Sequence, residues 1–419
     1  MSLIMCRRLH LAAASAAAIL GALAAGGSAA ADPAPPFSAL LAQVQGEAPR
    51  LAEAAAGVRQ AEGLARQAAA RPNPTVSADV QNFSANGPGA DQRQTTFSVE
   101  QPFEFGGKRT ARIAAGEAGL QASKARLTQS RVDYAVDLAN AYGDAEAADR
   151  QVALSQETLT LAEEDLRAAR ALVEAGKEAE LRSLQAEAGV TSARAALDAA
   201  RSARAAAFAR LTALAGSETP FTSVAESLLN HAAPSAGASA TDPLTVPAVL
   251  TAQAERDAAA RRVQVERTKA IPDVTVSAGV RRFQMDGATA FVAGVSVPFP
   301  LFDRNRGNIS ASLGELQAAE ARLRAARLDA EAALRTAIFQ IGAAQTRVVA
   351  AQQSEATAAE AYRLTRIAYE SGKSPLVELT NARRTLAEAR AQTIEAEQQR
   401  LRSIADLARL QGRAPFGVS

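Results

Sequence analysis

Hydrophobic and polar residues alternate with a period of two in only two regions of the chain, residues 73–103 and 273–300. Because successive side chains of a strand point to opposite faces, this alternation predicts β-strands with one apolar and one polar face. Each region contains two alternating stretches, and residues 86–89 form the loop between them in the first region. We therefore predict two short strand pairs.

The two strand pairs divide their side chains between faces in the same way. Val76 and Val99 are expected on the apolar face of the first pair, and the return strand of the second pair is expected to continue along its apolar face to Val297 and Phe299. Pro102 is expected to end the first pair, because proline cannot donate to a sheet. The polar faces are predicted to line water with the following residues: Ser77, Asp79, Gln81, Ser98, Glu100, Thr275, Ser277 and Arg281.

Stretches rich in Ala, Arg, Glu and Leu make up most of the remaining chain and predict helices. A proline-free helix is predicted from Lys108 to Ala175. At about 1.5 Å per residue it would be roughly 100 Å long, which is rare in a single globular domain. A second long helix is predicted from about Asn308 to Glu370. Glycine-containing turns near residues 176 and 372 are followed by returning helices, so we expect two long helical hairpins.

The second half of the chain repeats the plan of the first: a helix, a strand pair, a long helix, a tip turn and a returning helix. The tip sequence Gly176-Lys177, for example, recurs as Gly372-Lys373. We divide the chain into a signal peptide (1–31), a first repeat (32–216), a linker or equatorial segment (217–247), a second repeat (248–412) and a C-terminal tail (413–419).

The first 31 residues have the features of a secretory signal peptide. Arg7 and Arg8 precede an apolar run, and alanines at positions 29–31 supply the small residues that a signal peptidase recognises. Cys6 lies ahead of the apolar run, where a lipoprotein signal does not place its acylated cysteine, so we predict no lipid anchor.

Composition excludes several classes of function. The chain has 46 Lys and Arg against 44 Asp and Glu, and loss of Arg7 and Arg8 with the signal peptide leaves the two equal, which argues against a nucleic-acid partner. The mature chain keeps no cysteine, one histidine (His231) and one methionine (Met285). Cysteine–histidine metal sites and thiol nucleophiles are therefore excluded. We predict no catalytic residue, no metal site, no cofactor and no enzymatic activity.

Four amphipathic strands have two explanations. They either pack as a sheet on the helices or contribute to a membrane barrel with aromatic girdles. The barrel is favoured because aromatic residues make up only 4% of the chain, yet eight of its 13 phenylalanines fall in or beside the strands. Four strands cannot close by themselves, so several chains must share one barrel. The pattern leaves open whether two, three or more copies do so.

The segments EQPFEFGGKRTARI and VPFPLFDRNRGNI, the two tip turns and the duplicated plan resemble the TolC-like outer-membrane efflux proteins. The GGKR and FDRNRGN segments look most like the CzcC-type, cation-efflux branch. The resemblance implies a mainly α fold with a small β part: a homotrimer in which long helical hairpins form an α-barrel across the periplasm and four strands per chain form a twelve-stranded barrel in the outer membrane.

The resemblance further implies a passive exit duct of a tripartite pump, with a periplasmic adaptor protein, an inner-membrane RND transporter and outer-membrane lipid as partners. The hairpin tips would meet the adaptor: Gly176, Lys177, Gly372 and Lys373. The periplasmic gate would lie in the second repeat: Glu378, Asn381, Arg383 and Arg384. Glu378 matches the first acid of the gate in this family, whereas Asn381 stands where a second acid is often found.

The substrate follows from the resemblance alone, which implies divalent heavy-metal cations of the cobalt, zinc and cadmium type. A duct for organic compounds or for type I secretion is the alternative. A soluble periplasmic coiled-coil adaptor would explain the hairpins but not the apolar faces of the strands. With no cluster of metal-binding side chains in the mature chain, the duct itself is not expected to choose the ion.

Overall fold

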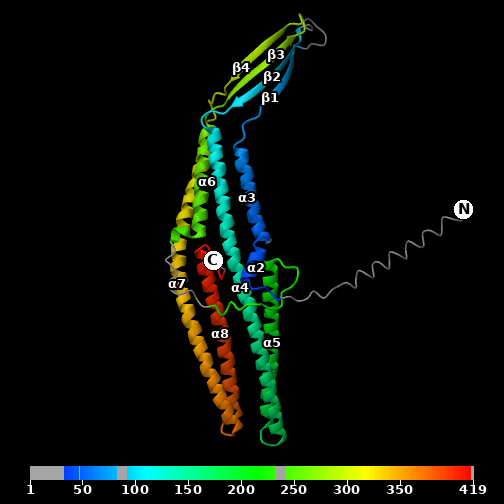
Figure 1. Cartoon of the computed structure of the whole chain (residues 1–419), viewed down its shortest axis with the longest axis vertical. Coiled ribbons are helices and arrows are strands. Elements are labelled where there is room, and N and C mark those ends of the chain that lie inside the picture. The colour runs from blue at the N-terminus through cyan, green and yellow to red at the C-terminus, as the bar shows by residue number, and fades with distance from the viewer. Residues whose placement is uncertain (1–32, 47, 83–91, 232–241, 417–419) are drawn as a thin grey trace, which may run out of the picture.

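The computed structural model describes residues 33–46, 48–82, 92–231 and 242–416. The predicted signal peptide, the predicted loop at 86–89 and most of the glycine- and serine-rich part of the linker lie outside the described residues. The described chain is long and slender, with a small sheet at one end and helices running from it to the opposite end (Figure 1).

The described residues form seven α-helices, a short 3-10 helix and one sheet. The helices are α2 (Phe37–Val44), α3 (Pro49–Ala68), α4 (Lys108–Glu174), α5 (Glu180–Ala215), η2 (Pro243–Thr245), α6 (Pro247–Lys269), α7 (Arg306–Glu370) and α8 (Leu376–Leu410). The strands are β1 (Thr75–Gln81), β2 (Gln94–Phe103), β3 (Val274–Phe283) and β4 (Thr289–Ser296). The predicted fold class, mainly helical with a small β part, is confirmed.

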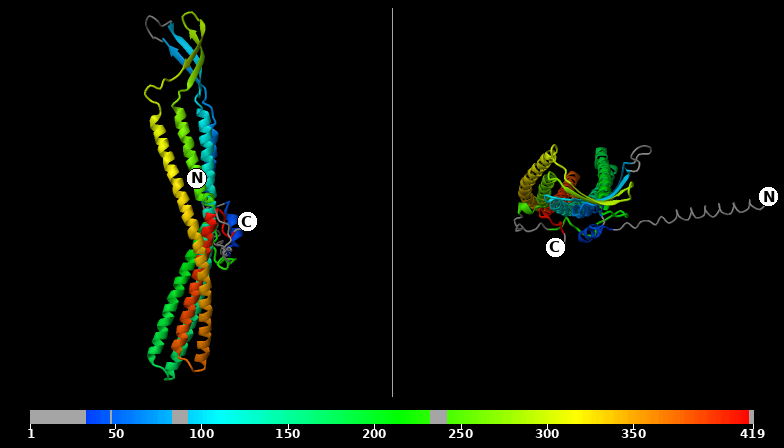
Figure 2. Two further views of the ribbon diagram at one scale, coloured as in Figure 1. Left: turned by 90° about the vertical axis from the view of Figure 1, so that its left-hand side faces the viewer. Right: turned by 90° about the horizontal axis from the view of Figure 1, so that it is seen from above.

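The helices lie side by side along the long axis. α4 and α7 run from the sheet to the far end, whereas α3 and α6 occupy only the half near the sheet, and α5 and α8 only the distal half (Figures 1 and 2). Contacts between elements give the order α3–α4–α6–α7 near the sheet and α5–α4–α8–α7 in the distal half. Each half is therefore a row of four helices in which α4 is internal and α7 is at the edge.

Alanine allows these helices to pack closely. Alanine is the commonest residue at the buried positions of α4, and small side chains let neighbouring backbones approach along a long, thin contact.

Among the described residues, no helix combines the length and the apolar character needed to cross a membrane.

The long helices begin at residues with left-handed backbone, Gly107 (φ 76°) before α4 and Asn305 (φ 57°) before α7. Arg109 donates a hydrogen bond from Nε to the carbonyl oxygen of Ala69 just after α3 (3.0 Å). In the second repeat, Asn305 Nδ2 donates to the carbonyl oxygen of Glu266 in α6 (2.8 Å). Each joint thus fixes the start of a long helix to the end of the shorter helix beside it.

The strands form a single antiparallel sheet in the order β1–β2–β3–β4. The two predicted pairs are present, β1 with β2 and β3 with β4, and β2 also pairs with β3 along its full length. The sheet therefore joins the two halves of the chain, and its edges are β1 and β4.

Two predicted strand ends were wrong. Pro102 lies within β2, opposite Thr275, instead of ending it. The pairing of β1 with β2 stops at Glu100, so Pro102 lies where β2 has no neighbour on that side, and a proline is tolerated there. β4 ends at Ser296, before Val297 and Phe299, because prolines at positions 298 and 300 interrupt the ladder.

The largest apolar core lies midway along the helices, where α2 and part of the predicted linker pack on α4. Tyr142 of α4 is fully buried, with its ring centroid 6.1 Å from that of Phe37. Its hydroxyl donates to the carbonyl oxygen of Pro35 (3.2 Å) and accepts from the backbone N–H of Glu226 (3.1 Å). Residues 217–231 of the linker are therefore held on α4.

Candidate functional site

The sheet separates polar from apolar side chains. Cross-strand partners bring Val76 opposite Val99, and Val280 opposite both Phe97 and Phe291. These apolar side chains are exposed, and Phe291 is 92% exposed. An apolar face with this exposure is typical of a surface that contacts lipid or another protein, and no described part of the chain packs on it.

The opposite face carries all of the polar strand residues that the sequence predicted to lie together. Ser77 and Ser98 hydroxyls are 2.8 Å apart, Arg281 Nε donates to the Thr96 hydroxyl (3.0 Å), and Ser277 donates to the carbonyl oxygen of Gly294 (3.3 Å). The register places the following residues on this one face: Ser77, Asp79, Gln81, Ser98, Glu100, Thr275, Ser277 and Arg281.

The two hairpin tips have the same turn. Gly176 (φ 67°) and Gly372 (φ 72°) adopt the left-handed conformation that favours glycine. The next residue in each turn, Lys177 or Lys373, donates its backbone N–H to a carbonyl five residues earlier, at 2.9 Å and 2.8 Å. Both lysines are exposed at the end of the molecule farthest from the sheet (Figure 1).

Beside the first tip, α5 exposes two leucines, Leu181 (63%) and Leu184 (57%). They are three residues apart and thus neighbours on one face of the helix. Neither leucine was among the predicted site residues. The signal was the pair of leucines in the first turns of a helix otherwise rich in alanine and charge.

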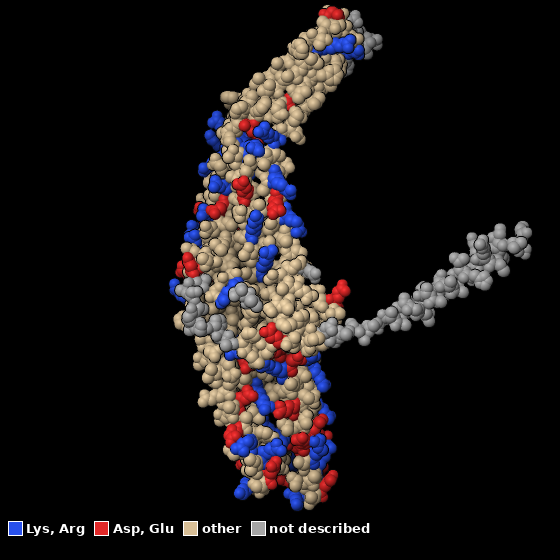
Figure 3. All heavy atoms as spheres, in the orientation of Figure 1, with Lys and Arg blue, Asp and Glu red and all other residues tan. Residues whose placement is uncertain are grey.

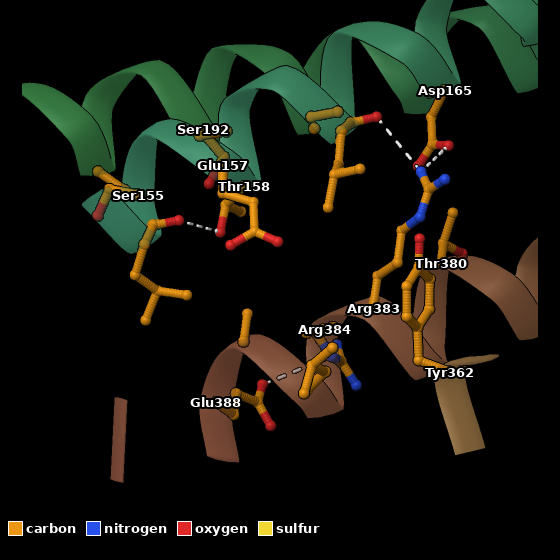
Figure 4. A pocket seen from close by; sticks show the side chains of 18 of the residues that line it. Ser155, Glu157, Thr158, Asp165, Ser192, Tyr362, Thr380, Arg383, Arg384 and Glu388 are labelled. Carbon is orange, nitrogen blue, oxygen red and sulfur yellow. Dashed lines mark hydrogen bonds and ion pairs between the residues drawn. The ribbon is translucent and has the colours of Figure 1, made fainter. Parts of the chain in front are cut away.

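Of the four predicted gate residues, only Arg383 reaches across to the first hairpin. Its guanidinium forms an ion pair with Asp165 of α4 and donates to the carbonyl oxygen of Leu161 (3.3 Å). It also lies 5.8 Å from the ring centroid of Tyr362 on α7. Figure 4 shows Arg383 pointing toward Asp165, with Tyr362 beside it. Arg383 thereby connects α8 with α4 and α7.

The other predicted gate residues form no ion pair with the first hairpin. Arg384 pairs with Glu388 one turn along α8 (3.6 Å), and both are exposed. Glu378 is exposed and accepts a hydrogen bond from Ser374. Asn381 is also exposed. Within one chain, neither arginine of the predicted gate pairs with Glu378.

A groove of about 870 Å³ lies between the two hairpins near their tips. Its walls come from α4, α5, α7 and α8, and Asp165, Tyr362 and Arg383 lie at one end of it (Figure 4). Burial raises the pKa of the Asp165 carboxyl above its ordinary value, and the neighbouring Arg383 guanidinium partly opposes this rise. The two hairpins therefore meet here through a contact that is electrostatic as well as apolar.

A second charged contact, which the sequence analysis missed, lies on α4 near the middle of the molecule. Glu146 is only 4% exposed and accepts hydrogen bonds from the backbone N–H groups of Leu228 (2.8 Å) and Leu229 (3.1 Å). Arg150 pairs with both Glu146 and Glu397 of α8, at 2.7 Å each. In an alanine- and acid-rich helix, no local pattern distinguishes this buried glutamate from the solvated ones around it.

Among the residues that the structure describes, no group of three or more His, Cys, Asp or Glu side chains is placed to hold a metal ion.

Comparison with known proteins identifies the family. A family model described as outer membrane efflux protein matches residues 40–217 and 245–413. The nickel-cobalt-cadmium resistance protein NccC of Alcaligenes xylosoxydans xylosoxydans is 46% identical over 399 residues, covering 95% of this chain and 91% of NccC. Two proteins of Cupriavidus metallidurans are also similar. The nickel and cobalt resistance protein CnrC is 48% identical over 74% of each chain, and the cobalt-zinc-cadmium resistance protein CzcC is 29% identical over 90% of each.

Solved structures share the fold. The outer membrane protein VceC of Vibrio cholerae superposes with a TM-score of 0.73 at 21% identity, over 90% of this chain and 96% of VceC. CusC gives a TM-score of 0.77 at 17% identity, over 90% of this chain and 92% of CusC. The predicted resemblance to TolC-like proteins, the outer-membrane location and the long periplasmic helical portion are thus confirmed. The chain belongs to the outer membrane efflux protein family, whose members are transport channels.

Proposed function

We propose that this chain is the passive exit duct of a tripartite pump that exports divalent heavy-metal cations of the nickel, cobalt, zinc and cadmium type. The observation that carries the proposal is the full-length similarity to NccC, at 46% identity, together with the similarity to CnrC and CzcC. All three relatives are named for resistance to such cations. An enzymatic role is not proposed, because the members of the family are transport channels.

The duct would be a homotrimer. A four-stranded sheet has two free edges, here β1 and β4, and free edges are not tolerated in lipid. Three copies would give twelve strands, closed by pairing β4 of one copy with β1 of the next, with the exposed apolar face toward lipid and the polar face toward water. The same arrangement would place the edge helix α7 of one copy against α3 and α5 of the next.

Docking of a periplasmic adaptor is proposed at the hairpin tips. Gly176, Lys177, Gly372 and Lys373 form two matching turns at the periplasmic end, and both lysines are exposed. Leu181 and Leu184 add an apolar pair next to the first turn. An inner-membrane RND transporter would supply the energy and select the ion. Cysteines placed at Lys177 and Lys373 are expected to cross-link to the adaptor, and lack of cross-linking at both tips would contradict the docking.

The periplasmic end is proposed to close at the first turns of α8. Three copies of Glu378 would form a ring that attracts cations, and the pairing of Arg383 with Asp165 would hold α8 in the closed position against α4. Glu378→Ala is expected to raise the single-channel conductance in planar bilayers. An unchanged conductance would remove Glu378 from the gate.

The test of function is complementation of a deletion strain, scored for tolerance of nickel, cobalt, zinc and cadmium. Wild-type protein is expected to restore metal tolerance but not tolerance of detergents and dyes. Val76→Asp, on the apolar face, is expected to abolish assembly, because it exposes a charge to lipid. Ser77→Asp, the neighbouring residue on the polar face, is the matched control and is expected to keep function. Equal tolerance at the two positions would contradict the barrel.

Export of organic compounds is the second candidate. It is favoured by the lack of any metal-binding group in the part of the chain that the structure describes. Tolerance of dyes and detergents restored by the wild-type protein, without metal tolerance, would support it over the first.

A further inference from the structure

Acidic and basic strand residues are distributed unequally between the two faces of the sheet. The acidic strand residues, Asp79 and Glu100, lie on the polar face, and so does Arg281, which bonds to Thr96. The apolar face, over the residues that the structure describes, carries two arginines and no acid: Arg93 and Arg282. In Figure 3 the sheet is nearly free of charged atoms until its far end, where they gather.

The register brings the two arginines together. Arg282 is the cross-strand partner of Thr95 on β2 and of Thr289 on β4. Arg93 lies two residues beyond Thr95, on the same face, and its Nη2 donates to the side-chain carbonyl of Gln284 (3.1 Å). Two guanidinium groups and two hydroxyls therefore share one small patch, which we name the basic rim: Arg93, Thr95, Arg282 and Thr289.

The arginines of the basic rim have hydrogen-bond donors that are available to a ligand. Arg93 and Arg282 are exposed, and within the described parts of the chain neither forms an ion pair. Arg281, one residue from Arg282, points to the opposite face and is engaged with Thr96. An arginine presents its donors as a planar fork that fits the oxygens of a phosphate, and a phosphate that bridges two such forks would be held firmly.

The position of the basic rim along the strand fits a membrane surface. Between Phe103 at the helix end of β2 and Arg93, the strand runs roughly 33 Å at about 3.3 Å per residue. With the strand tilted about 45° to the membrane normal, this corresponds to about 23 Å of height, close to the ~25 Å apolar band of outer-membrane barrels. The exposed Phe291 lies just inside this limit, and the basic rim lies at its end.

The helices extend from the opposite end of the sheet, so the basic rim faces the outer leaflet if the proposed trimeric barrel is right (Figure 1). We propose that the basic rim binds the phosphate groups of a phosphorylated glycolipid in the outer leaflet, three sites per trimer, and so fixes the height and rotation of the duct in the membrane. Charge complementarity identifies the occupant. The basic rim holds two cations and two hydroxyls, and the described acid next to it in the chain is Asp286, in the turn between β3 and β4. Its carboxylate accepts a hydrogen bond from the backbone N–H of Ala288 (3.0 Å) and pairs with neither arginine of the rim, so the two guanidinium groups are left to recognise an anionic headgroup.

Native mass spectrometry of purified trimers can test this proposal, with bisphosphorylated lipid A as the probe. Trimers of the double variant Arg93→Gln/Arg282→Gln are expected to bind the probe about tenfold more weakly than wild-type trimers, because two charge-assisted contacts are lost at each site. Arg281→Gln, on the polar face, is the matched control and is expected to bind as the wild type does. Equal binding by the double variant and the wild type would overturn the proposal.

A second measurement needs no variant. Wild-type trimers are expected to bind dephosphorylated lipid A about tenfold more weakly than the bisphosphorylated form, and equal binding of the two lipids would overturn the proposal even if the double variant failed to assemble. This outcome can be distinguished from failure of the proposed function, in which the wild-type protein would form no trimer or would not restore metal tolerance. If wild-type trimers form normally but bind the two lipids equally, only the lipid-binding proposal is wrong.

Discussion

α4 and α7 occupy the same place in the two halves of the chain and are almost equally long, yet their surroundings differ. α4 has neighbours on both sides, α3 and α6 near the sheet and α5 and α8 in the distal half. α7 contacts α6 and α8 on one side only, apart from the short η2. α4, which the structure describes in full, leaves none of its large apolar side chains highly exposed, whereas α7 exposes six.

The six exposed apolar residues of α7 lie on one stripe. At 3.6 residues per turn they fall within about a third of the helix circumference, opposite the side that packs on α6 and α8. We name this the α7 stripe: Leu328, Ile338, Phe339, Val349, Leu364 and Ile367. The two helices are therefore similar in sequence plan and length, but only α4 is packed on both sides within the described chain. The α7 stripe is the surface that a neighbouring copy would cover.

The largest expected effect comes from a charge in the α7 stripe. Phe339, at 77% exposure, is the most exposed of the six. Phe339→Asp is expected to leave the single chain folded but to reduce trimer yield by about tenfold or more, because a buried unpaired carboxylate costs several kcal/mol. Heat-modifiable trimers on gels measure this. Thr336→Asp, on the same helix outside the stripe, is the control, and equal loss in both variants would mean that the stripe is not the interface.

A smaller effect, on stability, is expected from a substitution in α4. The carboxylate of Glu146 is buried there, whereas the side chains of the α7 stripe are exposed. Glu146→Ala would leave the backbone N–H groups of Leu228 and Leu229 without their acceptor and would remove one of the two carboxylates that pair with Arg150, at a cost of about 3 kcal/mol. The melting temperature should fall, and amide exchange should rise at Leu228 and Leu229 in particular. Glu117→Ala, at an exposed position of α4, is expected to change neither, and an effect as large as that of Glu146→Ala would contradict the assignment.

The smallest effect on stability is expected from alanine substitutions at two glycines that occupy equivalent positions in α4 and α7. A Cβ at Gly116 of α4 would lie 3.0 Å from the Cα of Ala65 in α3, whereas a Cβ at Gly314 of α7 would have nothing within 4 Å. Gly116→Ala is expected to destabilise the protein by about 1 kcal/mol, because the helices must move apart. Gly314→Ala should stabilise it by about 0.5–1 kcal/mol through helix propensity. Thermal unfolding measures both. Equal destabilisation would indicate that a partner copy approaches α7 as closely as α3 approaches α4.

Much of the architecture was accessible from local pattern. Alternation located the strands and assigned all eight polar residues to one face, and glycines marked the two tips. The two errors, at Pro102 and beyond Ser296, both concern proline. Proline ends a strand only where its missing N–H group would have donated a hydrogen bond to a neighbouring strand. Whether such a neighbour is present cannot be read from the local sequence pattern.

The repeat, the long helices, the two-faced strands and the family could all be predicted from the amino-acid sequence, because each of these is carried by periodicity or by short segments of a few residues. Which elements meet became visible in the fold alone: β2 with β3, Arg383 with Asp165, and Glu146 with the linker backbone. These partners lie between about 80 and 220 positions apart in the chain, and a carboxylate or guanidinium looks the same in the sequence whether it is solvated or buried. Burial and pairing arise when the helices lie in a row. Only the fold therefore distinguishes α4, which has neighbours on both sides, from α7, whose apolar stripe is left exposed.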